Sequence, residues 1–450
     1  MLVEFGFRNQ ACFREWQTLS MVAEEDKRGA YLASTNLFQA PPGLPKGMSL
    51  IRSALVFGPN GSGKSSLCKA LQGLQMWITN PENSRMTWRF CFGQRFGGHA
   101  PSWTIEPAAF SVTFVQDSVR YRFEAEGADG QVTLERLTAY PKNHAQLWYE
   151  RVWSSAERQF IWKFGSHLKG PNQDLSKRTP ATAPFLGVAA TWEHSQLRTV
   201  AAWFRRVNTL VSMATHFPTE TDSLRSAVQR ALSEVTEAKQ GGPFLAFLRR
   251  LVTGADLGIV GLHPFPALGS EERQRVLATM QEQFQIPEEA LGAGERLALG
   301  PAFLFLHKSQ GPRQAFVLPE VAESDGTLRL LALSTQLYDA LSGDGILVVD
   351  ELDRSLHPAL TQAILRLFQE KEHVAAGAQL IGTVHDVTLL DPTLLRRDQI
   401  WFTQKGNDGA ASLFSLAEYK GVRKDDPFMR RYLSGVYGAI PDLDGFGVAP

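Results

Sequence analysis

One segment near the amino terminus constrains the fold more than any other part of the chain. Residues Ser53–Phe57 are apolar after the first position, and the glycine-rich segment Gly58–Ser65, GPNGSGKS, follows them directly. A short apolar run that stops at glycines predicts a buried strand leading into a tight loop. The next stretch, Leu67–Ile78, has apolar residues at helical spacing. The sequence therefore predicts a strand, a loop and a helix in direct succession.

This succession matches the P-loop pattern, and its flanking strand and helix argue against a chance glycine-rich turn. Glycines let successive backbone N–H groups curl around phosphate oxygens, and the helix points its positive end at the same anion. Lys64 is expected to contact the β- and γ-phosphates, and Ser65 to ligate Mg²⁺, so we expect ATP and Mg²⁺ as cofactors. The predicted nucleotide-binding residues of the loop are Gly58, Asn60, Gly61, Ser62, Gly63, Lys64, Ser65 and Ser66.

A second aliphatic run, Gly345–Val349, ends in the acidic pair Asp350 and Glu351. Such a run predicts a parallel core strand whose tip carries carboxylates beside the glycine-rich loop. Asp350 is then expected to hold Mg²⁺, and Glu351 to polarise the attacking water as a general base. The alternative is a buried strand followed by a solvated acidic turn.

Two further motifs each allow two interpretations. Ser324-Asp-Gly326-Thr opens the predicted helix Thr327–Leu341, so it is either a helix cap or a second phosphate-binding helix N-terminus. The predicted strand Gln379–Thr383 is followed after one residue by His385, which is either structural or a sensor of the γ-phosphate.

In their order along the chain, these motifs resemble those of the ABC ATPases. The resemblance comprises a Walker A loop, a long insertion, a signature motif, Walker B with a catalytic Glu, a D-loop at Asp353–Pro358 and a switch His. Ser324–Thr327 is more similar to the signature of the SMC, RecF and OLD branch than to that of transporters. Three further segments resemble the small RloA-like AAA ATPases of bacterial abortive-infection loci, namely LVEFGFRNQACFREWQTLSMVA, ESDGTLRLLAL and LAEYKGVRKDDPFMRRYLSGVYGAIP.

The resemblance implies an α/β fold of the ABC-type P-loop class, with a mixed or parallel core sheet, an antiparallel β subdomain and an inserted helical subdomain. The implied division is 1–187 and 296–450 for the ATPase domain, with 188–295 as the helical insertion. The implied catalytic residues are Lys64, Glu351 and His385. Ser324 and Gly326 are implied to contact the γ-phosphate of a partner subunit, and Gln94 and Glu106 remain alternatives for the Q-loop.

The segments between the motifs are less specific. Phe110–Val115 and Val119–Glu126 alternate around a polar break, which predicts a hairpin. Residues 79–105 are rich in Gly, Pro, Trp and Arg, which favours a loop. The stretch from 188 to 295 is mostly helical in pattern, with one helix predicted over Gln196–Met213.

Composition limits the partners and the compartment. Lys and Arg together count 46, as do Asp and Glu, so no net charge attracts the whole chain to nucleic acid or an anionic membrane. No apolar run approaches the roughly 20 residues of a membrane-spanning helix. Cys12, Cys68 and Cys91 lack metal-ligand spacing, and their odd number argues against a disulfide framework. We expect a soluble, cytoplasmic protein with no membrane partner.

Three functional hypotheses follow. The first is an ATP-dependent homodimer or higher oligomer that acts as a sensor or switch in an anti-phage or abortive-infection system. Too few residues follow His385 for the nuclease domain of OLD relatives, so its effector would be a separate protein such as a nuclease. The second is a maintenance ATPase that clamps DNA, like SMC or RecF, although no long coiled coil is predicted. The third is a nucleotide-binding scaffold without significant turnover.

Overall fold

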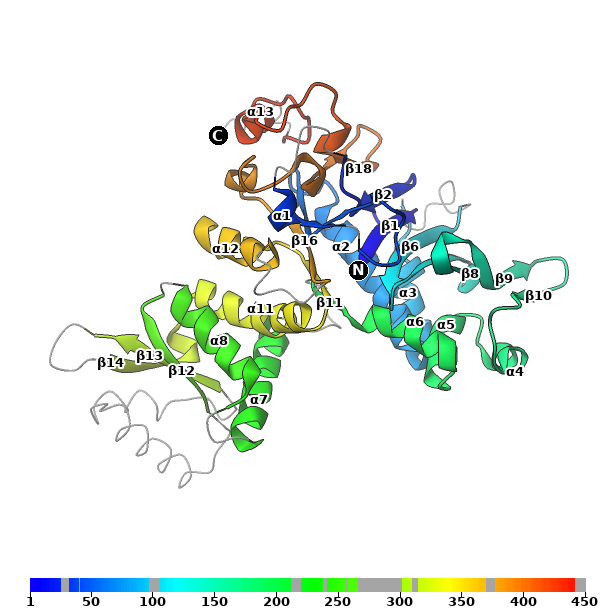
Figure 1. Ribbon diagram of the computed structural model, residues 1–450, viewed down its shortest axis with the longest axis horizontal. Coiled ribbons are helices and arrows are strands. Elements are labelled where there is room, and N and C mark those ends of the chain that lie inside the picture. Colours follow the sequence, from blue (N-terminus) through cyan, green and yellow to red (C-terminus); the bar gives the residue numbers. More distant parts are fainter. Residues whose placement is uncertain are drawn as a thin grey trace, which may run out of the picture. The chain divides into compact units, whose positions relative to one another are not determined.

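The chain forms two units whose segments alternate along the sequence (Figure 1). The first unit consists of Met1–Val211, Ala340–Leu352 and Gln362–Pro450, and the second of Ser212–Asp339 and Asp353–Thr361. The computed structural model describes residues 1–25, 32–39, 41–96, 106–211, 220–237, 241–255, 257–265, 302–309, 315–369 and 377–441. The predicted domain division stays a prediction, and residues 266–295 of the predicted insertion lie outside the described ranges.

A six-stranded sheet forms the centre of the first unit (Figure 1). In spatial order its strands are β11 (Val207–Leu210), β15 (Ile346–Val349), β16 (Gln379–Thr383), β5 (Ser53–Phe57), β17 (Ile400–Lys405) and β18 (Ala411–Ser415). Every neighbouring pair is parallel except β17 and β18. All residues of β5, β15 and β16 are buried, as expected for parallel strands covered on both faces. The predictions for these three strands are confirmed.

Helix α2 (Lys64–Thr79) begins directly after the glycine-rich loop and confirms the predicted helix. Its buried apolar residues recur at spacings of three and four, which places them on one helix face. They include Leu67, Leu71, Leu74 and Ile78. Burial of this face fixes the helix, and with it the loop that precedes it.

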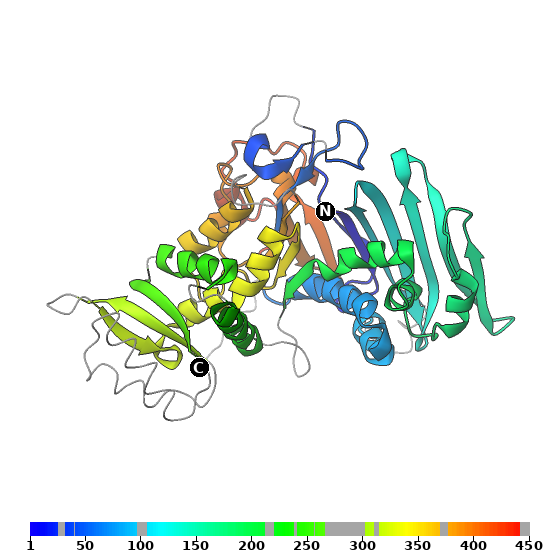
Figure 2. The same cartoon turned by 60° about the horizontal axis from the view of Figure 1, so that its bottom comes forward.

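A seven-stranded antiparallel sheet is the other large element of the first unit. In spatial order its strands are β10 (Gln159–Phe164), β9 (Gln146–Ser154), β8 (Gln131–Tyr140), β7 (Val119–Ala128), β6 (Ala108–Gln116), β1 (Leu2–Arg8) and β2 (Gln17–Ser20). The predicted hairpin is confirmed as β6 and β7. Helices α3 (Ser84–Phe92), α5 (Phe185–Thr191) and α6 (Ser195–Arg205) pack with α2 against one face of the sheet (Figure 2). Aromatic contacts fill this interface, such as Phe114 on Trp203 with centroids 4.2 Å apart.

The fold class is therefore confirmed as α/β, with a largely parallel core sheet and a separate antiparallel sheet. Smaller elements complete the two units. They are α1 (Ala33–Asn36), β3 (Leu37–Phe38), β4 (Leu50–Ile51), α4 (Asn172–Arg178), α12 (Pro358–Gln369) and α13 (Phe428–Leu433). Among the helices of the described ranges, none combines the length and hydropathy needed to cross a bilayer.

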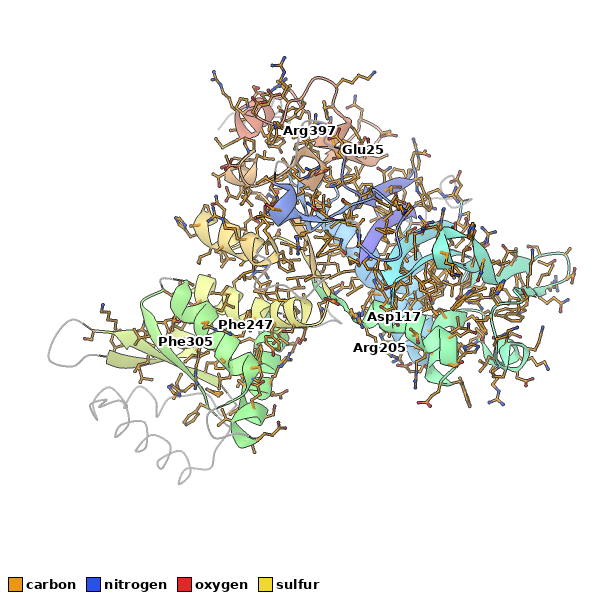
Figure 3. All side chains as sticks on the ribbon, in the orientation of Figure 1. Glu25, Asp117, Arg205, Phe247, Phe305 and Arg397 are labelled. Carbon is orange, nitrogen blue, oxygen red and sulfur yellow. The ribbon has the colours of Figure 1, made fainter. Side chains whose placement is uncertain are left out.

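The second unit combines helices with a small sheet. Its elements are α7 (Glu220–Glu237), α8 (Pro243–Gly254), most of α11 (Asp325–Ser342), and the antiparallel strands β12 (Ile259–Phe265), β13 (Ala302–Lys308) and β14 (Ala315–Pro319). Leu245 of α8, Phe305 of β13 and Leu331 of α11 belong to one buried cluster. Phe247, labelled in Figure 3 with Phe305, lies with its ring centroid 5.4 Å from that of Tyr338.

Two predicted segments are wrong. Residues 79–105 are predicted as loop, but Ser84–Phe92 forms α3, because Trp88 and Phe92 lie four residues apart and bury one helix face despite the intervening polar residues. Residues 97–105 of this segment lie outside the described ranges. The predicted helix Gln196–Met213 ends at Arg205, and Val207–Leu210 instead pairs with β15 as β11. Pairing at the edge of the core sheet outweighs the helical pattern, as tertiary context often does.

Candidate functional site

The glycine-rich loop leaves β5 at its carboxyl end and enters α2. Gly58 has φ +146°, and a Cβ there would lie 2.4 Å from the carbonyl oxygen of Thr403. Gly63 has φ +115°, and a Cβ there would lie 2.8 Å from the ring of Phe13. Only glycine fits both positions, because φ is positive and neighbouring residues pack closely against the backbone there.

Lys64, the first residue of α2, is 5% exposed. Its Nζ donates hydrogen bonds to the carbonyl oxygens of Gly58 at 2.7 Å and Pro59 at 3.1 Å. The ammonium group is therefore held inside the loop, where an anion bound to the cradle would meet it.

At the carboxyl end of β15, Thr383 orients both acidic residues. Its hydroxyl donates to Oδ1 of Asp350 at 2.6 Å and accepts the backbone N–H of Glu351 at 2.7 Å. Glu351 has φ +52°, a left-handed conformation that costs a non-glycine residue free energy and recurs at active sites. The backbone is thus strained at Glu351, the predicted general base, and the Thr383 hydroxyl of the neighbouring strand β16 stabilises this conformation.

A cavity of about 550 Å³ brings the two ends of this site together. Lys64 and Glu351, nearly three hundred positions apart, both line it, as does His385. Nε2 of His385 lies 4.0 Å from Oε1 of Glu351, and both side chains are 44% exposed. The loop residues that line the cavity are Asn60, Gly61, Gly63, Lys64, Ser65 and Ser66.

Three predicted site residues support the cavity without lining it: Gly58, Ser62 and Asp350. The Ser62 hydroxyl lies 2.6 Å from that of Thr403 on β17, which fixes the base of the loop. Burial raises the pKa of the Cys68 thiol on α2 well above its usual value, and the carboxylate of Asp350 adds to this. Asp350 is therefore close enough to α2 to act on it electrostatically.

Sequence reasoning missed four residues of the site: Ala11, Cys12, Thr383 and Thr403. Ala11 and Cys12 line the cavity, and Sγ of Cys12 lies 3.7 Å from Oγ of Ser66. Both threonines are fully buried, and their roles come from contacts across strands rather than from a motif in the sequence. Of the two Q-loop alternatives, neither Gln94 nor Glu106 lines the cavity.

Ser324 and Gly326 belong to the second unit. The Ser324 hydroxyl accepts the backbone N–H of Thr327 at 3.2 Å, so Ser324 caps this helix, and its contact with phosphate stays a prediction. A Cβ on Gly326 would lie 2.7 Å from the carbonyl oxygen of Ser355, which explains why glycine is needed there. Ser324 and Asp325 remain exposed, so the cap leaves their side chains accessible.

Comparisons with known proteins gave solved structures and one family model. Two of the solved structures are an SMC head bound to the C-winged helix domain of ScpA and the SMC head domain from Thermotoga maritima. Each is 12% identical to the chain, and the alignments cover 92% of the chain and 97% and 98% of theirs, with TM-scores of 0.39 and 0.38. No curated protein sequence matches the chain.

A family model described as "AAA domain, putative AbiEii toxin, Type IV TA system" matches residues 53–391. The matched range contains the glycine-rich loop, Ser324, the acidic pair Asp350 and Glu351, and His385. It covers more than half of the chain, and it confirms the predicted resemblance to P-loop ATPases of the AAA type. The chain therefore belongs to this AAA-domain family.

Proposed function

We propose that the chain binds ATP with Mg²⁺ and hydrolyses it. The observation that carries the proposal is the cavity of about 550 Å³ shared by Lys64, at the start of α2, and Glu351, after β15. The residues present fit a triphosphate. Gly58, Gly61 and Gly63 all have positive φ, which curls the loop backbone, and a buried ammonium group lies within it.

Each side chain has a defined role in this proposal. Lys64 would exchange its hydrogen bonds to the carbonyl oxygens of Gly58 and Pro59 for β- and γ-phosphate oxygens. Ser65 and Asp350 would hold Mg²⁺, which would neutralise phosphate charge. Glu351 would accept a proton from the attacking water. His385, 4.0 Å from Glu351, would contact the γ-phosphate and hold the carboxylate in place.

We further propose that two copies close over ATP and that Ser324 and Gly326 of one copy contact the γ-phosphate bound to the other. The exposed position of Ser324 at the start of α11 supports this role, because helix N-termini attract anions. In such a dimer, closure depends on ATP and hydrolysis releases it.

The biological role that we propose is a sensor or switch in an anti-phage or abortive-infection system, acting on a separate effector such as a nuclease. The family description, which names a toxin of a type IV toxin–antitoxin system, supports this context. A DNA clamp is the alternative. It predicts tight, salt-sensitive binding of duplex DNA by the purified protein in a gel shift with ATP, which the switch hypothesis does not.

Glu351→Gln tests the hydrolytic proposal. The amide cannot accept a proton from water, so turnover should fall at least about a hundredfold while ATP still binds. Phosphate release measures turnover, and light scattering with ATP measures the trapped dimer. Glu193→Gln, at an exposed position distant in sequence from the motifs, is the matched control. Unchanged turnover in Glu351→Gln would show that this residue is not the base.

A further inference from the structure

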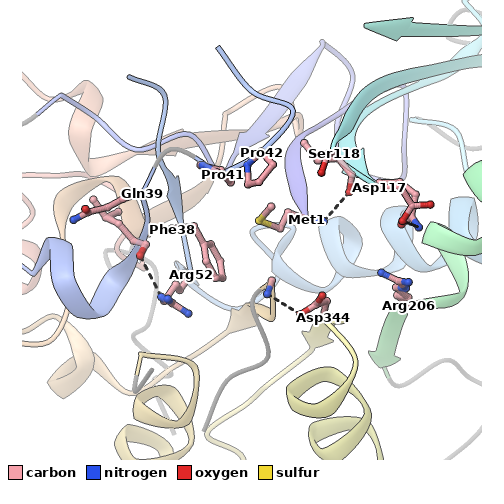
Figure 4. Close-up of a pocket in the computed structure, with 14 residues that line it drawn as sticks. Met1, Phe38, Gln39, Pro41, Pro42, Arg52, Asp117, Ser118, Arg206 and Asp344 are labelled. Atoms are coloured by element: carbon pink, nitrogen blue, oxygen red, sulfur yellow. Dashed lines mark hydrogen bonds between the residues drawn. The ribbon is translucent and has the colours of Figure 1, made fainter. Parts of the chain in front are cut away.

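A second cavity, of about 560 Å³, lies near the N-terminal ends of the parallel core strands. Figure 4 shows the residues that line it. Four of its lining residues come just before parallel strands: Arg52 before β5, Arg206 before β11, Asp344 before β15 and Gly377 before β16. The glycine-rich loop and Glu351 follow the carboxyl ends of β5 and β15. The two cavities are thus separated by the length of the core strands.

Arg52 is the unusual residue of this second cavity. It is only 7% exposed, and its guanidinium carbon lies 4.0 Å from the centroid of the Phe38 ring. Its Nε donates to the carbonyl oxygen of Leu37 at 3.3 Å, but no carboxylate of the described residues lies within ion-pairing distance of it. Burial lowers the pKa of Arg52, which reflects the cost of keeping this charge away from water.

A buried guanidinium is normally paired with an anion, because hydrogen bonds to carbonyl oxygens compensate its desolvation incompletely. Among the described residues, no carboxylate balances the charge of Arg52, so an anion from outside the chain would fit there. Arg206 adds a second cation to the same lining, while Phe38, Pro42 and Val115 give the cavity apolar surface (Figure 4).

We propose that this cavity binds a small organic carboxylate, with the carboxylate on Arg52 and an apolar body against Phe38. The volume lies within the roughly 300–1,000 Å³ of small-molecule sites. A guanidinium group can donate two parallel hydrogen bonds to the two oxygens of one carboxylate. Asp117 and Asp344 also line the cavity, and their charges disfavour ligands with several negative charges such as phosphate esters.

The site is independent of the proposed ATPase activity, so it is tested with the full-length protein and a binding readout. Benzoate is the probe, because it joins one carboxylate to a flat apolar ring, and benzamide is its neutral isostere. Ligand-observed NMR and calorimetry should show saturable benzoate binding that MgATP does not displace. Benzamide and inorganic phosphate should bind at least about tenfold more weakly than benzoate.

Arg52→Met keeps an unbranched side chain beside Phe38 but removes the charge, and it should abolish benzoate binding. Arg52→Lys keeps the charge but loses the two parallel N–H donors of the guanidinium group, and it should weaken binding by about tenfold. Arg178→Met, which removes an exposed arginine stacked on Trp192 outside the cavity, is the matched control and should bind benzoate like the parent chain. A cooperative thermal unfolding transition and an unchanged circular dichroism spectrum show that each variant is folded.

Three outcomes would overturn the proposal: no saturable benzoate binding, equal binding of benzamide, or unchanged binding in a folded Arg52→Met variant. If Arg52→Met does not fold, the exposed Arg206 provides the second test. Arg206→Gln should then weaken benzoate binding, and an unchanged affinity would count against the site.

Discussion

At the scale of single residues, Thr383 links the two acidic positions of the candidate site. One hydroxyl donates to Asp350 and accepts from the strained backbone of Glu351, and the carbonyl oxygen of Thr383 accepts the N–H of Leu352 at 2.9 Å. The left-handed conformation of Glu351 costs about 1–3 kcal/mol, and these hydrogen bonds compensate it. The geometry of the acidic pair therefore depends on a residue from another strand.

Thr383→Val should reduce ATP turnover by about ten- to a hundredfold, with nucleotide binding largely retained. The substitution preserves shape but leaves a buried N–H without its acceptor, so the free energy of unfolding should also fall by about 1–3 kcal/mol. Steady-state kinetics and urea unfolding measure the two effects. Thr191→Val, which removes a hydroxyl bonded within α5, is the control. Equal turnover in both variants would contradict the role of Thr383.

At the scale of elements, a buried ion pair fastens helix α5 to the antiparallel sheet. The Glu135 carboxylate accepts the backbone N–H groups of Phe185 at 2.9 Å and Leu186 at 3.1 Å, which open α5. It also accepts from the Tyr149 hydroxyl at 2.6 Å and pairs with Arg151 at 2.6 Å. Burial, with the adjacent Glu135 charge, raises the pKa of Tyr149 well above its usual range, so this hydroxyl stays a donor.

Glu135→Leu should destabilise the fold by about 3–5 kcal/mol, because it leaves the fully buried Arg151 without its counter-charge. The double variant Glu135→Leu/Arg151→Met should recover part of that loss, since apolar residues can replace a buried pair. Urea unfolding of the single and double variants measures the coupling. Additive effects of the two substitutions would show that the pair is not energetically linked.

Helix α6 begins with a histidine cap that depends on protonation. Nδ1 of His194 accepts the backbone N–H of Leu197 at 3.2 Å, while Nε2 lies 3.0 Å from Oδ1 of Asn172. Burial lowers the pKa of His194 below its ordinary value of 6.5. Below pH 6.5 the unfolded chain therefore binds a proton that the folded chain does not, and the free energy of unfolding falls as the pH is lowered.

His194→Gln should flatten this pH dependence, because the amide does not titrate. Urea unfolding on either side of pH 6.5 measures the slope for each variant. His144→Gln removes an exposed histidine and should leave the slope of the parent chain unchanged. The cap assignment is wrong if His194→Gln retains the full loss of stability in acid.

The elements also show what sequence can predict. Strands β5, β15 and β16 were predictable because their apolar runs stop at glycine or charged residues, and the same runs located Lys64, Asp350 and Glu351. Strand β11 was not predictable, because Val207–Leu210 forms a strand rather than a helix only by pairing with β15, which is far away in the sequence. The roles of Thr383 and Thr403 depend on contacts across strands, which no local pattern encodes.

At the scale of the whole molecule, the proposed dimer makes a prediction about mixtures. In a two-fold dimer, each site would combine the loop of one copy with Ser324 of the other. Lys64→Ala and Ser324→Arg should each abolish turnover alone. A heterodimer of the two carries both defects in one site and leaves the other intact, so an equal mixture should regain about a quarter of the parent activity.

This complementation separates action between copies from action within one. If Ser324 served the loop of its own chain, every site in the mixture would carry one defect, and no activity would return. Phosphate release measured after co-incubation with ATP gives the result, and mixing before or after crosslinking tests whether subunits exchange. Because Lys64 belongs to the first unit and Ser324 to the second, each substitution alters a different unit of the chain.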